Sequence, residues 1–424
     1  MHKYRKRIVD KLLEYRLEEM GAVLIEGPKW CGKTTTAEQQ SHSKILLADP
    51  QTRQQYVELL QINPSIILNG ETPRLIDEWQ IAPQIWDAVR AEVDRRGETG
   101  QFILTGSAVP PSSEDIYHSG TGRYAWLTMR TMSLWESGDS SGEISLKRIF
   151  EGDSNQFSTN DYPLERIAYL TCRGGWPAAI PLNERASLRV SVNYTDAIVK
   201  RDVGRTEKQL NDSEMVRKIL RSYARIQGTQ TPATVILDDI SPTIASGISI
   251  NTLHAYLKAL KEIFVIEDMP SWNPNLKSKT AIRTADTRYF TDPSIAVASL
   301  GLGPNDLIND LKTFGLIFES LCVRDLRIYA EALDGNVYHY RDKTGLECDA
   351  VIHLRNGSYG LVEIKLGGDN AIEHAAETLT KLASKIDEQK MGKPAFLMVL
   401  TAVGPYAFKR KDGIWIVPIG CLKD

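Results

Sequence analysis

The pattern of apolar and polar positions in the first 130 residues predicts a sheet of short, buried strands. Apolar runs at 22–25, 75–76, 102–104 and 124–127 each end in polar or small residues. A helical pattern follows the first run, after the stretch GPKWCGKT. Strands that are apolar on both faces are typical of parallel sheets. The pattern therefore predicts an α/β fold for this part of the chain.

A second α/β pattern occupies the last quarter of the chain. Residues 315–333 have the periodicity of a long helix, and three short strands with turns between them are expected within 336–367. The stretch GLVEIKLG, at 360–367, alternates apolar with charged residues, which is the period of a half-buried strand. A helix at 371–388 and a strand at 394–401 would complete this unit.

The middle of the chain is expected to be mainly helical. Residues 136–162 are rich in small and polar types, and they indicate a domain boundary. Helical patterns follow at 193–205 and 213–227, each with basic residues on one face. The turn RGGWPAAI at 173–180 has no role that the sequence alone reveals.

A winged-helix module is expected around 246–292. Ser249 is a suitable N-cap for a helix, and strands are expected at 264–268 and in RYFTD. Such a module can place a helix in the DNA major groove, or it can pack as a protein lid. Acids in the module, Glu262 among them, leave both roles open. The residues considered for DNA contacts are Asn251, Thr252, His254, Lys258, Lys277, Lys279 and Arg283.

The most specific stretch is GPKWCGKT at 27–34, which matches G-x-x-x-x-G-K-[ST] at every fixed position. Glycines let backbone N–H groups wrap a phosphate, and the following helix adds its positive dipole end. Lys33 would neutralise phosphate charge, and the Thr34 hydroxyl would bind Mg²⁺. The predicted nucleotide-binding residues are Gly27, Pro28, Lys29, Trp30, Cys31, Gly32, Lys33, Thr34 and Thr35.

Acids and hydroxyls end two further apolar runs. Asp77 and Glu78 follow the run in PRLIDEWQ. Asp77 would hold Mg²⁺ through water and Glu78 would polarise the attacking water, unless the pair is only an exposed acidic turn. Thr105 and Ser107 follow the run in QFILTGSA, and either hydroxyl would sense the γ-phosphate or orient the water.

Arg123 immediately precedes the run at 124–127. An arginine in that place can act as an arginine finger that reaches the nucleotide of a neighbouring subunit. A surface salt bridge is the alternative. The first interpretation predicts a homo-oligomer.

Three charged residues suggest a second site near the C-terminus. Asp349 lies in the second of the three expected strands, and Glu363 and Lys365 lie on one face of the third. An acid followed by acid-x-lysine is the arrangement of the endonuclease core written PD-(D/E)xK. Two carboxylates would hold Mg²⁺, and the lysine would position water or stabilise the charge on phosphorus. Glu347 and Gln389 are weaker candidates.

Composition argues against several other classes of protein. The chain has 424 residues, a net charge of -3 and 25% charged residues, which is typical of a globular protein and not of a general polyanion binder. The five cysteines form no CxxC pair, so neither a zinc site nor a disulfide framework is indicated. The basic N-terminus lacks an apolar signal core, and no apolar run is long enough for a membrane. A cytoplasmic protein without a membrane partner is expected.

In their order and spacing, GPKWCGKTT, LIDEWQ, ILTGSA and the pair Gly122-Arg123 resemble the core of AAA-type ATPases. More narrowly, the whole chain resembles a prokaryotic group that carries a C-terminal domain of unknown function with a restriction-endonuclease-like core. The resemblance implies ATP as the nucleotide, Walker A and Walker B roles for the motifs above, and Glu319 as a further supporting acid beside Asp349 and Glu363. Lys29 and Trp30 depart from the Pro-Arg-Gln-like run expected there.

Taken together, these features predict an α/β protein of three domains. A P-loop AAA-type ATPase domain (1–137) would precede a helical and winged-helix region (160–300) and an endonuclease-like domain (305–424). The expected function is ATP hydrolysis coupled to action on DNA, with metal-dependent nuclease activity as a candidate. The alternative is a nucleotide-dependent switch or scaffold that binds a protein partner and carries an inactive nuclease-like domain.

Overall fold

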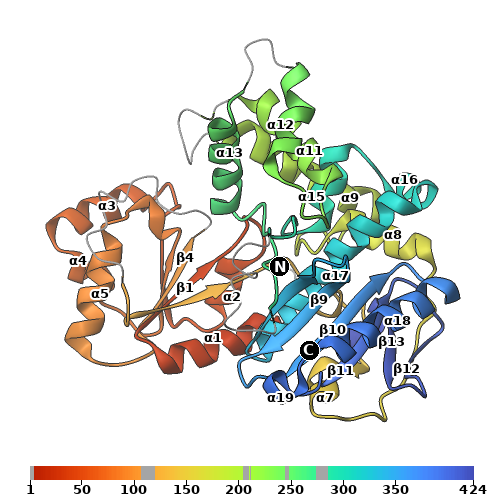
Figure 1. The fold of residues 1–424 in the computed structure, drawn as a ribbon. Coiled ribbons are helices and arrows are strands. Elements are labelled where there is room, and N and C mark those ends of the chain that lie inside the picture. Colours follow the sequence, from red (N-terminus) through yellow and green to blue (C-terminus); the bar gives the residue numbers. More distant parts are fainter. Residues whose placement is uncertain (1–3, 107–119, 204–209, 211, 244–247, 274–284) are drawn as a thin grey trace. The chain divides into compact units, whose positions relative to one another are not determined.

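The protein is described by a computed structural model, whose fold is drawn in Figure 1. The chain divides into two compact units. The first unit comprises Met1–Thr131, Lys200–Asn211 and Lys258–Phe264, and the second comprises Met132–Val199, Asp212–Leu257 and Val265–Asp424. The structure describes all residues except 1–3, 107–119, 204–209, 211, 244–247 and 274–284. Four residues discussed above therefore lie outside the described part: Ser107, Lys277, Lys279 and Arg283.

A five-stranded parallel sheet forms the centre of the first unit (Figure 1, red to orange). Its order is β2-β3-β4-β1-β5. The strands are β1 (Ala22–Glu26), β2 (Ser43–Leu46), β3 (Arg74–Asp77), β4 (Phe102–Gly106) and β5 (Tyr124–Thr128). The central strands are buried on both faces, which explains their uninterrupted apolar runs. The predicted parallel α/β fold is confirmed.

Helices cover both faces of this sheet. Alternate residues of β1 enter different cores, with Leu24 on one face and Val23 on the other. The Leu24 core includes residues of α3 (Arg53–Ile62), α4 (Pro64–Leu68) and α5 (Ile85–Arg96), and the Val23 core includes residues of α1 (Ile8–Glu19) and α2 (Lys33–Glu38). The carboxyl edge of the sheet remains for the site described below.

The second unit contains a seven-stranded sheet of order β7-β12-β13-β11-β10-β9-β8. Its strands are β7 (Ser158–Thr159), β8 (Gly335–Arg341), β9 (Glu347–Leu354), β10 (Tyr359–Lys365), β11 (Phe396–Thr401), β12 (Tyr406–Lys409) and β13 (Ile414–Pro418). The helices expected beside it are α17 (Leu311–Ala332) and α18 (Asp369–Lys385), and α19 (Glu388–Met391) follows. The strand expected at 360–367 is present as β10, but the expectation that it is half-buried was wrong, because β10 is buried on both faces except at Lys365.

The polar stretch 136–162 is folded and belongs to the second unit. It contributes α6 (Leu134–Ser137), β6 (Ile144–Ser145), α7 (Leu146–Phe150) and β7. Strand β7 pairs with β12, and β6 pairs with β14 (Leu422–Lys423). The division between the units falls just before this stretch, between Thr131 and Met132. Its small and polar residues reflect short edge strands and turns.

The rest of the second unit is mainly helical. Its helices are α8 (Leu164–Arg173), α9 (Glu184–Ala197), α11 (Ser213–Arg225), α12 (Ala233–Ile240), α13 (Ile250–Glu262, whose last turn belongs to the first unit), α15 (Pro293–Leu300) and α16 (Pro304–Asn309). Ser249 caps α13 through the amide of Thr252, as expected. The strand expected at 264–268 was wrong: only single bridges join Ile266 to Phe290 and Met269 to Thr287.

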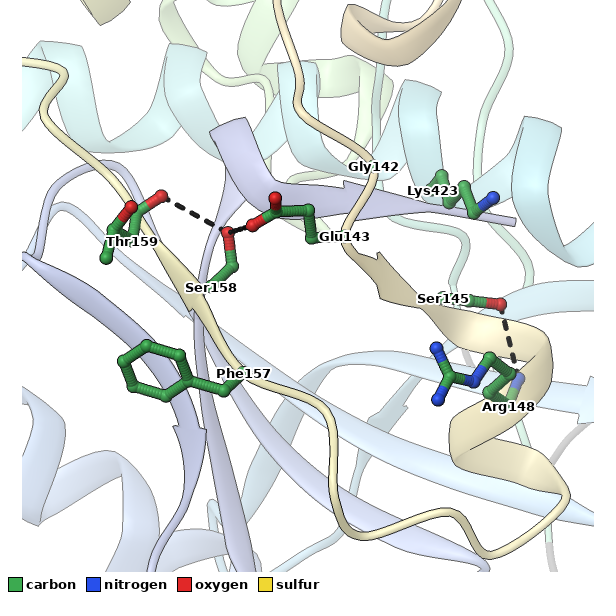
Figure 2. A pocket seen from close by; sticks show the side chains of 8 residues that line it. All are labelled: Gly142, Glu143, Ser145, Arg148, Phe157, Ser158, Thr159 and Lys423. Atoms are coloured by element: carbon green, nitrogen blue, oxygen red, sulfur yellow. Dashed lines mark hydrogen bonds between the residues drawn. The ribbon is translucent and has the colours of Figure 1, made fainter.

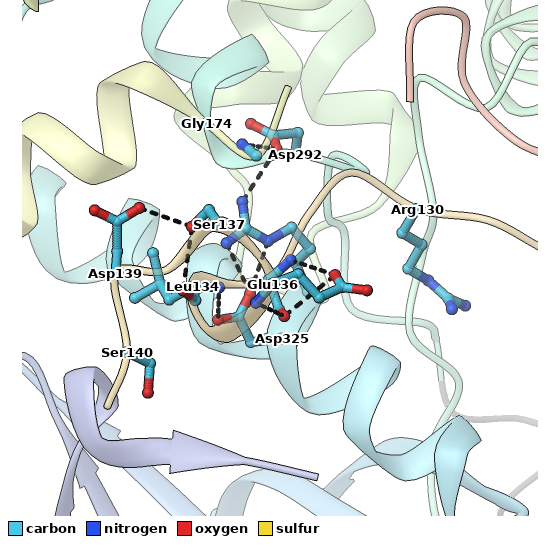
Figure 3. A network of polar contacts seen from close by, with 12 residues as sticks. Arg130, Leu134, Glu136, Ser137, Asp139, Ser140, Gly174, Asp292 and Asp325 are labelled. Carbon is cyan, nitrogen blue, oxygen red and sulfur yellow. Dashed lines mark hydrogen bonds and ion pairs between the residues drawn. The ribbon is translucent and has the colours of Figure 1, made fainter. Parts of the chain in front are cut away.

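A buried polar network surrounds the Gly-Gly-Trp turn of the second unit (Figure 3). Arg324 of α17 forms ion pairs with Asp292 at 3.1 Å and Asp325 at 2.7 Å, and all three side chains are almost fully buried. Asp292 accepts a hydrogen bond from the Gly175 amide. A Cβ on Gly174 would lie 2.4 Å from the Asp292 carboxylate, so the turn has to be glycine. The Gly-Gly turn of the RGGWPAAI motif thus has a structural role, because it packs against the buried Asp292 carboxylate.

Candidate functional site

Three motifs of the first unit meet at the carboxyl edge of its sheet. The P-loop follows β1, Asp77 ends β3, and Thr105 lies next to the end of β4. Because β4 lies between β1 and β3, the ends of these strands are neighbours. Ligands of open α/β sheets bind at this edge. The sequence motifs therefore converge as a nucleotide site requires.

Two glycines and a lysine shape the P-loop. Gly27 has a φ of 146°, and a Cβ there would lie 2.0 Å from the Met129 carbonyl oxygen. Gly32 has a φ of 107° and caps α2, whose first residue is Lys33. The Lys33 ammonium is buried and donates to the carbonyl oxygens of Gly27 and Pro28, at 2.9 Å each. The loop thus holds its lysine in place with its own backbone.

The other P-loop residues differ in exposure. Cys31 is fully buried, and its thiol donates to the Met129 carbonyl. Lys29 is partly exposed and Thr35 is exposed. Trp30 is 54% exposed and has a left-handed backbone with a φ of 66°. Such a conformation is costly for a bulky residue and is often found at functional sites.

Thr34, Asp77 and Thr105 form one hydrogen-bonded group. The hydroxyls of Thr34 and Thr105 both donate to Asp77 Oδ1, at 2.6 Å each. Thr105 Oγ1 also accepts from the amide of Glu78 at 3.3 Å. Of the two sensor candidates, Thr105 therefore contacts both acids, and Ser107 lies outside the described residues. Glu78 itself has a left-handed backbone with a φ of 56°.

The N-terminal segment supports the P-loop through contacts that the sequence did not reveal. Arg7 is buried and donates to the carbonyls of Cys31 at 3.0 Å and Arg130 at 2.9 Å. The Tyr4 hydroxyl lies 2.9 Å from that of Thr36 in α2. No local motif marks Arg7, because its two partners are 24 and 123 residues away.

Arg123 lies at the opposite edge of the sheet from the P-loop. It precedes β5, whose first residue pairs with Ala22 at the start of β1. Its side chain is 43% exposed and forms an ion pair with Asp94 at 2.7 Å. It therefore points away from the nucleotide site of its own unit.

The second candidate site lies in the second unit. The Lys365 ammonium is 3.0 Å from Asp349 Oδ2 and 2.8 Å from Glu363 Oε2. Asp349 also accepts a hydrogen bond from the Ile364 amide at 2.7 Å. Strands β9 and β10 pair as far as Val362 and Ala350, so the next pair in this antiparallel register would be Glu363 and Asp349. The register therefore explains why the two carboxylates share one side of the sheet.

Burial raises the pKa of two acids of this cluster, Glu363 and Glu319. Burial, reinforced by Asp349, raises the pKa of Glu363 to about 8, against the opposing effect of Lys365. Burial and Asp349 likewise raise the pKa of Glu319, on α17, well above its ordinary value. For Lys365, burial lowers the pKa, but Asp349 and Glu363 outweigh it and raise the pKa overall. Lys365 thus pairs directly with two acids, Asp349 and Glu363, and Glu319 is buried near them.

Tyr289 is a further member of this cluster that sequence reasoning missed. Its hydroxyl is fully buried and donates to Glu319 Oε1. Glu363 Oε1 is buried and has no hydrogen-bond partner among the described residues. Within the same residues, no three side chains of His, Cys, Asp or Glu converge closely enough to hold a metal ion. The weaker candidate Glu347 instead lies 3.7 Å from Arg341 at the surface.

Two basic residues of α11, on the basic face expected from the sequence, are paired with acids. On α11, Arg217 lies 3.1 Å from Asp196, and Lys218 lies 2.8 Å from Glu214. These exposed pairs reduce the positive charge that the helix presents.

The second unit also has an open hollow of about 650 Å³, shown in Figure 2. Its wall includes Arg148, Phe157 and Lys423, and the Ser158 hydroxyl there donates to Glu143 at 2.6 Å. None of the predicted site residues lines it. Separately, across the part of the chain that the structure describes, no helix has both the length and the apolar character needed to cross a membrane.

Three family models match successive parts of the chain. Residues 19–137 match a family described as an AAA domain, 164–306 match a domain of unknown function (DUF8612), and 314–422 match another (DUF4143). The AAA-domain match includes the P-loop, Asp77, Glu78 and Thr105. The first of these regions is a P-loop AAA-type ATPase domain, and the protein is an ATPase. The C-terminal match is consistent with the resemblance described above.

Two curated relatives resemble most of the chain. They are the uncharacterized proteins Mb2031c of Mycobacterium bovis and Rv2008c of Mycobacterium tuberculosis. Each is 22% identical over 357 residues, which cover 83% of this chain and 72% of the relative.

Solved structures give weaker likenesses. The Walker-type ATPase paby2304 of Pyrococcus abyssi matches 68% of this chain and 94% of its own, with 14% identity and a TM-score of 0.42. The Hef helicase domain of Pyrococcus furiosus matches 94% and 86%, with 12% identity and a TM-score of 0.22. Because both TM-scores are below 0.5, neither likeness identifies the fold of this chain.

Proposed function

We propose that this ATPase uses ATP and Mg²⁺ to drive action on DNA, and that the acidic cluster of the second unit cleaves DNA with a divalent metal. The observation that carries the DNA part is the convergence of Asp349 and Glu363 on the Lys365 ammonium, with Glu319 buried nearby. Three acids and a lysine in one buried place are costly unless they serve a function.

In the nucleotide site, each residue has one role in this proposal. The backbone amides of 27–34 wrap the phosphates, and Lys33 exchanges its two carbonyl partners for phosphate oxygens. Thr34 and Asp77 would hold Mg²⁺, which would neutralise the charge of the phosphates. Their direct contact at 2.6 Å brings both oxygen ligands to one point, so these residues fit the ion. Glu78 accepts a proton from the attacking water.

Arg123 acts in this proposal on the nucleotide of a second copy of the chain. Its place at the amino edge of the sheet supports an action between subunits, because the P-loop of its own unit lies beyond the carboxyl edge. A strand of five residues separates the two edges by about 16 Å. The proposed assembly is therefore a homo-oligomer whose sites are completed by neighbours.

At the acidic cluster, Asp349 and Glu363 would hold the metal. Glu363 Oε1 is buried without a hydrogen-bond partner among the described residues, and a cation would satisfy it. Two carboxylates are sufficient for Mg²⁺, which keeps several waters as further ligands. The metal would polarise the phosphodiester and activate water. Lys365 would leave its present partners and stabilise charge on the phosphate.

The alternative function is a nucleotide-dependent switch or scaffold with an inactive nuclease-like domain. The observation that favours it is the ion pairing of Lys365 with both carboxylates, since a lysine there takes the place of a cation. In that case the cluster is a structural element of a protein-binding domain. The expected winged helix would then serve as a lid and would not read DNA.

ATPase assays with and without single-stranded, duplex and branched DNA distinguish the two functions. If the protein acts on DNA, one of these DNAs should stimulate ATP hydrolysis. Metal-dependent cleavage of DNA should also occur, and Glu363→Gln should abolish it. Slow turnover that no DNA changes, with no cleavage in Mg²⁺ or Mn²⁺, would rule out the first function. Lys385→Met, which removes an exposed ion pair of the same unit, is the control variant.

A further inference from the structure

Gln80 lies against the acid that is proposed to activate the attacking water. After the left-handed residue Glu78, the chain makes a single 3-10 turn, η1 (Trp79–Ile81), which the Ile81 amide closes by donating to the Glu78 carbonyl at 3.0 Å. This tight turn brings the side chain of Gln80 back over Glu78. Gln80 Nε2 donates a hydrogen bond to Glu78 Oε2.

The chemistry of the two groups fixes which way the amide faces. An ionised carboxylate only accepts hydrogen bonds, so the Gln80 nitrogen has to face Glu78 and its oxygen has to face elsewhere. That oxygen, Gln80 Oε1, is buried and has no hydrogen-bond partner among the described residues. A buried acceptor without a donor is costly, and its presence calls for an explanation.

Gly106 keeps space for this oxygen at the end of β4. A Cβ on Gly106 would lie 3.0 Å from Gln80 Oε1 and 2.8 Å from Trp79 Nε1. Any other residue at 106 would therefore displace the Gln80 amide. Gly106 directly follows Thr105, which contacts both Asp77 and the Glu78 amide. The unpartnered oxygen thus lies between Glu78 and the strand that carries the sensor candidate.

We propose that Gln80 is a catalytic residue of ATP hydrolysis that positions the attacking water together with Glu78. The water donates one hydrogen bond to the Glu78 carboxylate and the other to Gln80 Oε1. Its oxygen attacks the γ-phosphorus, the bond to the β–γ bridging oxygen breaks, and one proton of the water passes to Glu78. The products are ADP and inorganic phosphate. This inference rests on the proposed role of Glu78.

A structural role for Gln80 would give different results from a catalytic one. If its amide only braced the turn, losing it would lower stability and weaken nucleotide binding together with turnover. If it holds the water, losing it lowers kcat and leaves nucleotide affinity unchanged, because the water is bound tightly only in the transition state.

The experiment compares Gln80→Leu and Gln80→Asn with wild type in full-length protein. Gln80→Leu keeps the size of the side chain and removes both polar atoms, so kcat should fall about 10²-fold. The Kd for ATP, measured with Mg²⁺ under non-turnover conditions, should stay within about twofold. Gln80→Asn retains the amide on a shorter stem and tests the same loss if the leucine variant fails to fold. Gln54→Leu is the matched control, because Gln54 donates to Glu58 in the same way on an exposed helix.

Two further measurements separate this inference from the function on which it rests. Glu78→Gln with Gln80→Leu should be no slower than Glu78→Gln alone, because both residues act on one water. Glu78→Gln with normal turnover would remove the proposed function itself. A different result would overturn only the role of Gln80. In that case Glu78→Gln loses turnover, but the kcat of Gln80→Leu and of Gln80→Asn stays within about twofold of wild type.

Discussion

Replacing Lys365 by methionine should destabilise the second unit and make it responsive to metal. The lysine is the only cation that contacts Asp349 and Glu363 among the described residues. Methionine keeps most of the buried stem and removes the charge. Breaking a buried ion pair by removing one partner costs about 3–5 kcal/mol. Because the Lys365 side chain is 29% exposed, we expect about 2–3 kcal/mol after allowing for solvent screening.

The cost of this substitution should depend on pH in a defined direction. The pKa of Glu363 is raised to about 8 in the folded protein, from an ordinary value of 4.5. The folded state therefore keeps a proton that the unfolded chain releases, and this favourable difference is lost as pH rises from about 4.5 through 8. Without Lys365, ionisation of Glu363 becomes still less favourable. The difference in unfolding free energy between wild type and Lys365→Met should thus be larger at pH 9 than at pH 6.

Thermal unfolding of full-length protein, with EDTA or with Mg²⁺ or Mn²⁺, measures both effects. If Asp349 and Glu363 hold a metal, the ion replaces the missing charge and stabilises Lys365→Met by about 2.7 kcal/mol at 100 times its Kd. Wild type should gain less, since its lysine competes. Asp349→Asn together with Glu363→Gln should abolish the gain, and Lys385→Met should change stability by less than about 1 kcal/mol. No metal response in Lys365→Met at pH 8 would refute the metal site.

Three further predictions concern other parts of the molecule. Lys33→Ala should abolish ATP binding and Glu78→Gln should keep it while losing turnover, as equilibrium binding and phosphate release would show; a Glu78→Gln enzyme of normal rate contradicts the assigned role. Arg123→Ala should lower kcat by about 10³-fold with little change in ATP affinity, and mixing it with Lys33→Ala should restore part of the rate; full activity in a monomer would exclude this. Arg324→Met should lower the unfolding free energy of the second unit by about 3–5 kcal/mol, against less than about 1 kcal/mol for the exposed ion pair in Arg355→Met. Burial raises the pKa of Asp325 to about 6, so this carboxyl is neutral at lower pH. The loss of unfolding free energy in Arg324→Met should therefore become smaller below pH 6. A loss that does not change with pH would show that unpaired carboxylates are not its cause.

The sequence predicted those features that are fixed by local spacing. The P-loop is contiguous, and strands that are apolar on both faces predicted the parallel sheet that carries it. Glu363 and Lys365 are two residues apart on a strand, so their common face followed from strand geometry alone. The third residue of this cluster, Asp349, could also be predicted, because a short hairpin leaves few alternative registers between its two strands.

Features that depend on distant contacts could not be predicted. Arg7 contacts the Arg130 carbonyl, and Tyr289 contacts Glu319 from another segment. Nothing in the neighbouring residues of either side chain marks it. The strand expected at 264–268 was wrong because Val265 and Ile266 are buried without forming a ladder: among the described residues, Ile266 makes a single bridge, to Phe290. Metal binding by the acids of the second unit depends on the balance between their charges and that of Lys365. The spacing of residues in the sequence does not determine that balance.

The pairing of β6 with β14 has a consequence for how the protein is made. Ile144 and Ser145 pair with Leu422 and Lys423, residues that leave the ribosome almost 280 positions later. At a synthesis rate of about 5–20 residues per second, this edge waits roughly 15–55 s for its partner. The ATPase sheet, complete by Thr128, can form long before then. During that interval a nascent chain with a finished nucleotide site carries an unfinished second unit, which exposes strand edges to chaperones or to neighbouring chains.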